Sequence, residues 1–96
     1  MSAMVVGSLR IDFAIYESRS LKDKRRVLKS FKDRLAARHN VSVAEVDHLD
    51  SWQRATVGIA MVSNDATHTH SGLDKIVDFA RQQRGLSLID YEKTLW

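Results

Sequence analysis

Hydrophobic and polar residues alternate along four short segments of this chain, and they follow a helical repeat along two longer ones. The clearest alternation covers residues 5–16. Its apolar members are Val5, Leu9, Ile11, Phe13 and Ile15. Because successive side chains of a strand point to opposite faces of a sheet, this pattern predicts a strand with one buried face. Strands are likewise predicted over residues 40–48, 53–64 and 86–95, with a bulge near residues 44–45, where the alternation slips.

The segment after the first strand is predicted to form an amphipathic helix. Five apolar residues fall within a stripe about 120° wide, since each residue advances a helix by roughly 100°. They are Leu21, Val27, Leu28, Phe31 and Leu35. Ser20 is a favourable N-cap, with Asp23 placed as in a capping box. We expect the helix to end near His39 and Asn40, with Asn40 as a left-handed terminator.

A second helix is predicted between the third and fourth strands. Residues 63–65 offer several N-cap candidates, and the apolar pattern runs to about Arg84 before Gly85 stops it. The apolar positions, spaced as on one helix face, are Leu73, Ile76, Val77 and Ala80. Gly72 costs a helix roughly 1 kcal/mol relative to alanine, so the start of this helix is expected to fray.

The order of these elements predicts a single domain over residues 1–96. Strand, helix, strand, strand, helix, strand, with about 20 residues per crossover, is the order of a ferredoxin-like split βαβ arrangement. The predicted fold class is therefore α+β: a four-stranded antiparallel sheet with both helices on one face. The other face is expected to carry mainly small and polar side chains, namely Ser8, Arg10, Asp12, Ala14, Tyr16, Thr56, Gly58, Ala60 and Val62.

Composition fits one soluble domain and excludes several kinds of site. Hydrophobic residues make up 44% of the chain and charged residues 28%, which is ordinary for a globular protein. Because the chain has no Cys, it forms no disulfide, thiolate metal site or cysteine nucleophile. No apolar run approaches the roughly 18 residues of a membrane span, and the first residues lack the basic region of a signal peptide. We therefore expect a cytoplasmic protein that does not bind membranes.

The charge of the chain is unevenly distributed. Residues 19–38 hold nine of the fifteen Lys and Arg against only Asp23 and Asp33, a net charge of +7. The remainder carries −4, so the whole chain has a net charge of +3. Such asymmetry within one small domain indicates a polyanion or an acidic protein surface as the ligand, and that surface could belong to a second copy.

The outer arc of the first helix is the best candidate for a binding site. It carries Lys22, Arg25, Arg26 and Lys29, flanked by Arg19 and Lys32. Like-charge pairs three or four residues apart each cost a helix about 0.2–0.5 kcal/mol. The cations also crowd the first two turns, where the helix dipole is already positive. This arrangement suits a bound phosphate, although a solvated or internally paired face is the other interpretation.

Several motifs resemble those of a known family. They are "SLKDKRRVLKSFKDRLAARHNVSVAEVDH" (20–48), "WQRATVGIAMVSNDATH" (52–68), "LDKIVDF" (73–79) and "LIDYE" (88–92), which are similar to the YlxP-like family of small bacterial proteins of unknown function. The resemblance implies a ferredoxin-like fold and carries over no catalytic residue. Members are often encoded beside translation-initiation and ribosome-maturation factors, which implies a setting near RNA or the ribosome. The chain departs from the pattern at Glu17, where Pro is common, and at Gly72 and a second His in "HTHSGLDK".

Other candidate sites are weaker. Reading of RNA by the open sheet face needs exposed aromatic residues, and that face offers only Tyr16. The face better suits contact with a second sheet, and hence a homodimer. Glu45, Asp47, His48 and Asp50 could supply metal ligands, but Asp47 and His48 point to opposite faces of a strand.

Isolated histidines and an aromatic residue complete the list of candidates. His68 and His70 lie about 200° apart on a helix and so do not share a ligand. Trp52 is expected to anchor the hairpin at the edge of the core or to contact a partner. We find no nucleophile elbow, phosphate-cradling glycine loop or paired-carboxylate motif, so we predict no enzyme, catalytic residue, cofactor or metal site.

We therefore predict a small, non-enzymatic accessory protein that docks on RNA or a ribosomal particle. The predicted phosphate contacts are Lys22, Arg25, Arg26 and Lys29, flanked by Arg19 and Lys32. The alternative is a homo-oligomeric structural or regulatory protein, in which the basic helix pairs with acidic residues such as Glu45 and Asp47 of a partner subunit. RNA affinity should fall steeply with added salt, whereas oligomerisation through an apolar sheet face should hardly respond.

Overall fold

Two ten-residue strands, β1 (Val5–Ala14) and β3 (Arg54–Ser63), pair antiparallel along their whole length at the centre of the sheet. The edge strands are β2 (Ser42–Asp47) and β4 (Ser87–Leu95), in the order β2-β3-β1-β4. This arrangement comes from a computed structural model, which describes residues 3–96. The pairing of β1 with both β3 and β4 places the first strand in the interior of the sheet, as its long alternation of buried residues requires.

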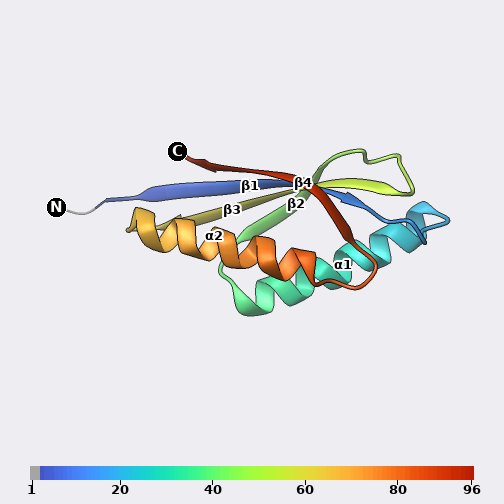
Figure 1. Ribbon diagram of the computed structural model, residues 1–96, viewed down its shortest axis with the longest axis horizontal. Helices are drawn as coiled ribbons and strands as arrows, with labels where there is room; N and C mark the ends of the chain where they lie inside the picture. Colours follow the sequence, from blue (N-terminus) through green and yellow to red (C-terminus); the bar gives the residue numbers. More distant parts are fainter. Residues whose placement is uncertain (1–2) are drawn as a thin grey trace.

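Both helices cover the same face of the sheet (Figure 1). Helix α1 (Leu21–Arg38) connects β1 to β2, and helix α2 (Ala66–Arg81) connects β3 to β4. The order of elements and the antiparallel sheet confirm the predicted ferredoxin-like α+β fold. The molecule is elongated, with extents of 51 × 21 × 18 Å, so its two ends are well separated.

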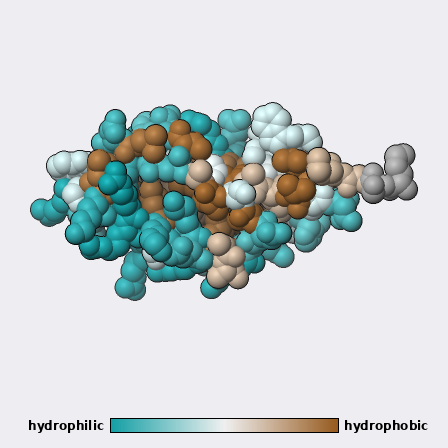
Figure 2. Space-filling model, turned by 180° about the vertical axis from the view of Figure 1, so that it is seen from behind, coloured by the Kyte–Doolittle hydropathy of each residue, from teal (hydrophilic) through white to brown (hydrophobic). Residues whose placement is uncertain are grey.

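The core lies between the sheet and the two helices. Phe31 of α1 packs edge-on against Phe13 of β1, with ring centroids 5.4 Å apart, and stacks on Phe79 of α2 at 6.0 Å. One residue of α1 therefore joins the sheet to the second helix. Neither helix covers the other face of the sheet (Figure 1). Seen from behind, with the sheet again above the helices, the molecule has hydrophobic residues along its middle, between hydrophilic ones (Figure 2).

The strands depart from prediction mainly at their irregularities. Strand β1 ends at Ala14, two residues before the predicted end, although Ile15 is also buried. The bulge of β2 lies between Glu45 and Asp47, slightly later than predicted. A second register shift, between Asp12 and Phe13 against β4, was not predicted from the sequence.

The ends of helix α1 agree with prediction except for the terminator. The side chain of Ser20 accepts a hydrogen bond from the amide of Asp23 at 3.0 Å, as an N-cap should. The cap at the other end is His39, whose φ of −137° is extended. The predicted left-handed conformation of Asn40 is wrong, since the left-handed residues among 3–96 are His48 and Gly85.

The N-cap of helix α2 is Asp65, whose carboxylate accepts a hydrogen bond from the amide of His68 at 3.0 Å. The helix runs without a break through Gly72 and ends at Arg81, three residues earlier than predicted. Gly85 then turns the chain into β4 with a φ of +83°, a conformation that glycine adopts without steric cost.

Two residues of the open sheet face, Thr56 and Ala14, are nevertheless buried. Thr56 is fully buried and donates a hydrogen bond of 2.6 Å to Asp12 Oδ1, which satisfies its hydroxyl away from water. Ala14 is 3% exposed, because β1 is ending there and the chain turns toward α1. No helix described here is long and apolar enough to cross a membrane.

Candidate nucleic-acid interface

The first half of helix α1 contains a lysine that is buried. Lys24 is 1% exposed and occupies the same helix face as three core residues, Leu28, Phe31 and Leu35. These four positions follow the spacing of one helix face, with steps of four, three and four residues. Of the nine basic residues in 19–38, Lys24 is therefore unavailable to a ligand.

The ammonium of Lys24 holds the β2–β3 hairpin. It donates hydrogen bonds to the carbonyl oxygens of His48 (2.9 Å), Leu49 (3.2 Å) and Arg54 (3.4 Å). Glu45 Oε2 lies 2.9 Å from the same nitrogen, and this contact is an ion pair without hydrogen-bond geometry. The hairpin is thus tied directly to the first turns of α1.

This ion pair removes the main acid invoked by the oligomer hypothesis. Glu45 is only 16% exposed and is engaged within its own chain by Lys24. Asp47, the other acid, contacts Arg10 at 3.2 Å. Because that carboxylate already neutralises a buried cation, Glu45 is poorly placed to receive the basic helix of a partner subunit. The pairing itself stays a prediction, since the side chain of Asp47 is 54% exposed.

A glutamine ties the same hairpin to the loop before α1. The side-chain amide of Gln53 donates to the carbonyl oxygens of Tyr16 and Ser18, both at 3.1 Å. The Gln53 carbonyl accepts a hydrogen bond of 2.9 Å from the amide of Ile15. Trp52 was expected to anchor this turn, but its side chain is 56% exposed, so the anchoring falls to Gln53.

Three exposed hydrophobic residues lie on the segments that this network joins. Tyr16 is 72% exposed, Leu49 is 58% exposed and Trp52 is 56% exposed. The loop after β1, the β2–β3 hairpin and the start of α1 all lie at one end of the molecule (Figure 1). Exposing two aromatic rings to water lowers the stability of the unbound protein. Their exposure at one end of the molecule therefore indicates a contact surface.

The predicted basic residues are distributed around this end and along α1. Of the six, five are exposed and Lys32 is half-buried; the exposed ones are Arg19, Lys22, Arg25, Arg26 and Lys29. Lys29 Nζ donates to Asp33 at 2.7 Å, and this hydrogen bond, together with the carboxylate charge, raises the pKa of Lys29 above its ordinary value of 10.5. Among residues 3–96, Lys29 is the member of the set that forms an ion pair.

We call the surface formed at this end the basic end. It comprises three cations and three hydrophobic side chains, namely Arg19, Lys22, Arg25, Tyr16, Leu49 and Trp52. The cations come from the start of α1 and the hydrophobic side chains from the two segments beside it. The sequence predicted these cations as a site but did not place the aromatic residues beside them. The hydrogen bonds of Lys24 and Gln53 that bring the two together join segments distant in the sequence.

A small basic hollow extends this surface along the side of α1. Arg26 and Arg34 of α1 and Arg84 of the loop before β4 line a cavity of about 190 Å³, which no carboxylate lines. Arg34 donates to the side-chain oxygen of Gln83 at 2.9 Å, which fixes its guanidinium toward that loop. The sequence hypothesis had counted Arg26 alone among these three.

The acidic hairpin shows no sign of a metal site. The carboxylate of Asp47 accepts a hydrogen bond of 2.7 Å from the amide of His48, which adopts a left-handed φ of 59°. That hydrogen bond, the charge of His48 and Arg10 lower the pKa of Asp47 below its ordinary value of 3.8. In the part of the chain covered by the structure, no three His, Asp or Glu residues are grouped as metal ligands would be.

Fold and surface define a small α+β protein with a ferredoxin-like sheet and a basic, partly aromatic end. The chain belongs to a family described as "Protein of unknown function (DUF503)", whose model matches residues 6–93. It is 37% identical over 75 residues to "Uncharacterized protein YlxP" of Bacillus subtilis (strain 168), an alignment covering 78% of this chain and 82% of that protein. The family resemblance noted in the sequence is thereby confirmed.

Two solved structures are similar in fold. "De novo designed protein Foldit4" matches with a TM-score of 0.56 at 14% identity, covering 97% of this chain and 96% of that one. SnoaB, described as a cofactor-independent oxygenase from Streptomyces nogalater, matches with a TM-score of 0.49 at 18% identity, covering 99% and 92%. The designed protein supports the fold, and neither similarity carries an argument about activity.

Proposed function

We propose that this protein is a non-enzymatic accessory that binds single-stranded RNA, in a ribosomal setting, through its basic end. The observation that carries the proposal is the presence of exposed Tyr16 and Trp52 beside Arg19, Lys22 and Arg25 at one end of the molecule. Cations neutralise backbone phosphates and aromatic rings stack on unpaired bases, so single-stranded nucleic acid is the ligand that uses both.

The charges alone would support only a weaker statement. Exposed Lys and Arg are common on solvated helix faces, where they carry no ligand. At the basic end, however, the cations occupy the positive end of the α1 dipole, which favours a bound anion. The hydrogen bonds of Lys24 and Gln53 hold the neighbouring hydrophobic side chains beside them. The proposal therefore depends on the combination of charge and exposed apolar surface.

A charge-reversal pair tests the site. In Lys22→Glu/Arg25→Glu, we expect affinity for a single-stranded RNA of about 12 nucleotides to fall at least about tenfold at low salt. The matched control is Lys75→Glu/Arg81→Glu, which makes the same change in net charge from exposed positions on α2. With an RNA that carries no terminal phosphate, the control should retain most of the affinity, since its cations lie outside the basic end.

Salt dependence and ribosome binding extend this test. The slope of log affinity against log salt should be about 0.7 per phosphate neutralised on single strands, so it should become shallower in the Lys22/Arg25 variant. The same proteins are then compared for co-sedimentation with ribosomal subunits. Equal loss in the variant and its control would mean that net charge alone drives binding, and it would refute the assignment of the basic end.

Trp52 offers a direct signal of base stacking. The chain has two Trp residues, so the variant Trp96→Phe leaves Trp52 as the single indole. Quenching of its fluorescence by the RNA is expected, and Trp52→Ala should weaken binding by about 1–3 kcal/mol. An RNA that binds without affecting Trp52 fluorescence would exclude stacking on this residue.

Self-association through the open sheet face is the second candidate function. A shallow trough of about 420 Å³ runs over β2, β3 and β1 and is lined by small residues such as Ala44, Gly58 and Ala60. Beside these strands, Val46 is 48% exposed and Val62 is 60% exposed. A dimer through this face would resist salt, and Ala60→Arg would return it to the monomer mass in solution.

A further inference from the structure

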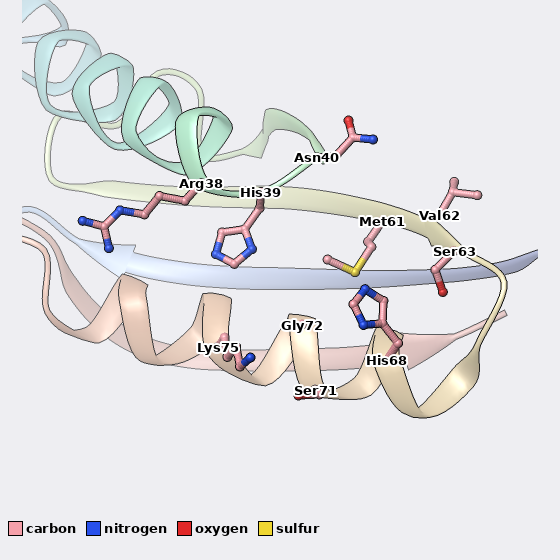
Figure 3. Close-up of a pocket in the computed structure, with 10 residues that line it drawn as sticks. All are labelled: Arg38, His39, Asn40, Met61, Val62, Ser63, His68, Ser71, Gly72 and Lys75. Atoms are coloured by element: carbon pink, nitrogen blue, oxygen red, sulfur yellow. The ribbon is translucent and has the colours of Figure 1, made fainter.

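A cleft of about 400 Å³ lies between the last turn of α1 and the first half of α2 (Figure 3). Its third wall is the end of β3, through Met61, Val62 and Ser63. This cleft is at the other end of α1 from the basic end, and a helix of 18 residues is about 27 Å long. The two surfaces are therefore separate.

Four basic residues line the cleft, although the guanidinium of Arg38 points away from the two imidazoles and toward Phe79 (Figure 3). Arg38 and His39 come from the end of α1, and His68 and Lys75 come from α2. Figure 3 shows the imidazoles of His39 and His68 directed into the space between the helices, from opposite sides. No Asp or Glu lines the cleft. Its lining is thus entirely neutral or cationic.

Neighbouring carboxylates do not form ion pairs with the Lys and Arg residues of the cleft. Lys93 engages Asp74, the acid next to Lys75, at 2.7 Å. Neither Lys75 nor Arg38 takes part in an ion pair among the described residues 3–96. The guanidinium of Arg38 lies 5.0 Å from the ring centroid of Phe79, which limits its motion without neutralising its charge.

The dipole of α1 explains only part of this arrangement. A basic residue in the last turn of a helix is stabilised by the negative end of the dipole, and Arg38 needs no other reason to be there. Lys75 lies in the middle of α2, where the dipole offers no such stabilisation. Its side chain lines the same cleft as the imidazoles of His39 and His68, so a bound anion would account for a cation at this position.

Gly72 keeps the cleft open. A Cβ atom at this position would lie 2.8 Å from Met61 Cε and 3.1 Å from Met61 Sδ, so the methionine packs directly over the glycine. Met61 is 8% exposed and forms the apolar floor. A larger residue at position 72 would push Met61 into the hollow. The glycine that weakens the helix therefore has a structural use in this chain.

We propose that this cleft binds a small organic phosphate. The ammonium of Lys75 can neutralise a phosphate group, and the imidazoles of His39 and His68 can hydrogen-bond its oxygens. Arg38 adds a positive charge at the edge of the cleft. The hydroxyl of Ser71 and the amide of Asn40 are further polar groups in the lining. The apolar floor then accommodates the organic part, and the cleft volume falls within the range of small-molecule sites.

The test uses the full-length protein and defined phosphorylated probes. Inorganic phosphate, ribose 5-phosphate and adenosine monophosphate are titrated separately, and the backbone amide signals of Ser71, Gly72 and His39 are followed by NMR. We expect saturable shifts at these amides, with the organic phosphates binding at least about tenfold more tightly than inorganic phosphate. Ribose without phosphate should produce none.

Matched variants locate the site. Arg38→Gln/Lys75→Gln should weaken binding of the best probe by at least about tenfold. Arg34→Gln/Arg81→Gln removes the same charge from the same two helices outside the cleft, and it should bind normally. Tight organic-phosphate binding that only the first pair weakens supports the proposal. Absence of saturation by all three probes, equal weakening in both pairs, or no preference over inorganic phosphate would overturn it.

The single-stranded RNA experiment supplies a second distinction. A terminal phosphate of an RNA strand could present the same chemical group to the cleft as a free organic phosphate. Titration with short RNAs carrying or lacking a 5′-phosphate shows which source is used, because only the first would shift Gly72 if the strand end occupies the cleft. RNA binding at the basic end does not depend on the result, so the two proposals fail separately.

Discussion

Helix α1 carries cations at both of its ends, but the surfaces around the two ends differ in shape. At its start, Arg19, Lys22 and Arg25 are exposed on a surface that also carries aromatic side chains. At its end, Arg38 and His39 line a cleft that α2 closes from the other side. A convex charged surface can follow a long phosphate backbone, whereas a hollow suits one small anion. The comparison shows that local shape, as well as charge, decides which ligand a basic helix can bind.

The difference arises from what packs against each end. At the start of α1, the hydrogen bonds of Lys24 and Gln53 connect the β2–β3 hairpin to the helix and to the loop before it. The hydrophobic side chains of these two segments therefore lie beside the cations. At the other end, Met61 packs directly against Gly72 of α2, so its side chain stays out of the cleft. Replacement of Lys24 or Gln53 should therefore alter the start of α1 and spare the cleft, and replacement of Gly72 should do the reverse.

The largest effect is expected at Lys24. Lys24→Met leaves the carbonyl oxygens of His48 and Leu49 without their donor and Glu45 without its counter-charge. We expect a loss of about 3–5 kcal/mol in the free energy of unfolding, measured by urea denaturation. Lys22→Met is the exposed control and should change stability by less than about 0.5 kcal/mol. A small effect at Lys24 would show that the hairpin does not depend on this lysine.

A double variant separates the two causes of that loss. Lys24→Met/Glu45→Met removes the unpaired carboxylate but leaves the carbonyl oxygens without a donor. It should therefore recover part, but not all, of the stability that Lys24→Met loses. In the folded fraction of both variants, RNA affinity should fall while phosphate shifts at the cleft persist.

The fold was predictable because its signals are local and repeated. The alternation of Leu9, Ile11 and Phe13, the Ser20 cap and the helical repeat up to Leu35 each fix an element within a few residues. Their order then leaves few topologies for a chain of this length. Bulges and the ends of helices were less accurate, because they depend on pairing between distant segments.

Lys24 shows why charge counts mislead. It is one of the nine cations counted in residues 19–38, although it lies on the same helix face as Leu28, Phe31 and Leu35. That spacing was a usable signal for burial. Its partners were not predictable, since the carbonyl oxygens that satisfy it lie 24 to 30 residues away on a hairpin.

The cleft could not be found from the order of residues. Arg38 and Lys75 are far apart in sequence and meet only because both helices cover one face of the sheet. From the sequence, Gly72 is only a cost to the helix, and the nearest histidine to His68 is His70. The relevant neighbour of His68 is instead His39, across the cleft.

A smaller effect is expected at Gln53, within the basic end. Gln53→Ala removes two hydrogen bonds of 3.1 Å to the loop before α1, which should cost about 1–2 kcal/mol of stability. Trp52→Ala is the comparison, since that side chain is 56% exposed and should contribute little to stability. We expect the first change to act on folding and the second on RNA binding, measured in parallel by urea denaturation and by RNA titration.

Gly72→Ala tests the opposite end with little effect on stability. Alanine favours the helix by about 1 kcal/mol, but its Cβ displaces the tip of Met61, so the net change should be within about 1 kcal/mol. Binding of ribose 5-phosphate should nevertheless weaken, because the displaced methionine occupies the cleft. RNA affinity should not change. Unaltered phosphate binding in this variant would mean that Met61 does not set the depth of the cleft.

The smallest effect is a pH dependence confined to the basic end. The pKa of Asp47 lies below 3.8 in the folded protein because of the hydrogen bond from His48, the charge of His48 and Arg10. The carboxylate thus adds stability above pH 3.8, and this contribution disappears as the pH falls through the lowered pKa. Asp47→Asn should therefore be slightly less stable than the wild type near neutral pH and equal to it in strong acid. Amide exchange in the β2–β3 hairpin should show the same trend, whereas the cleft, which no carboxylate lines, should not follow it.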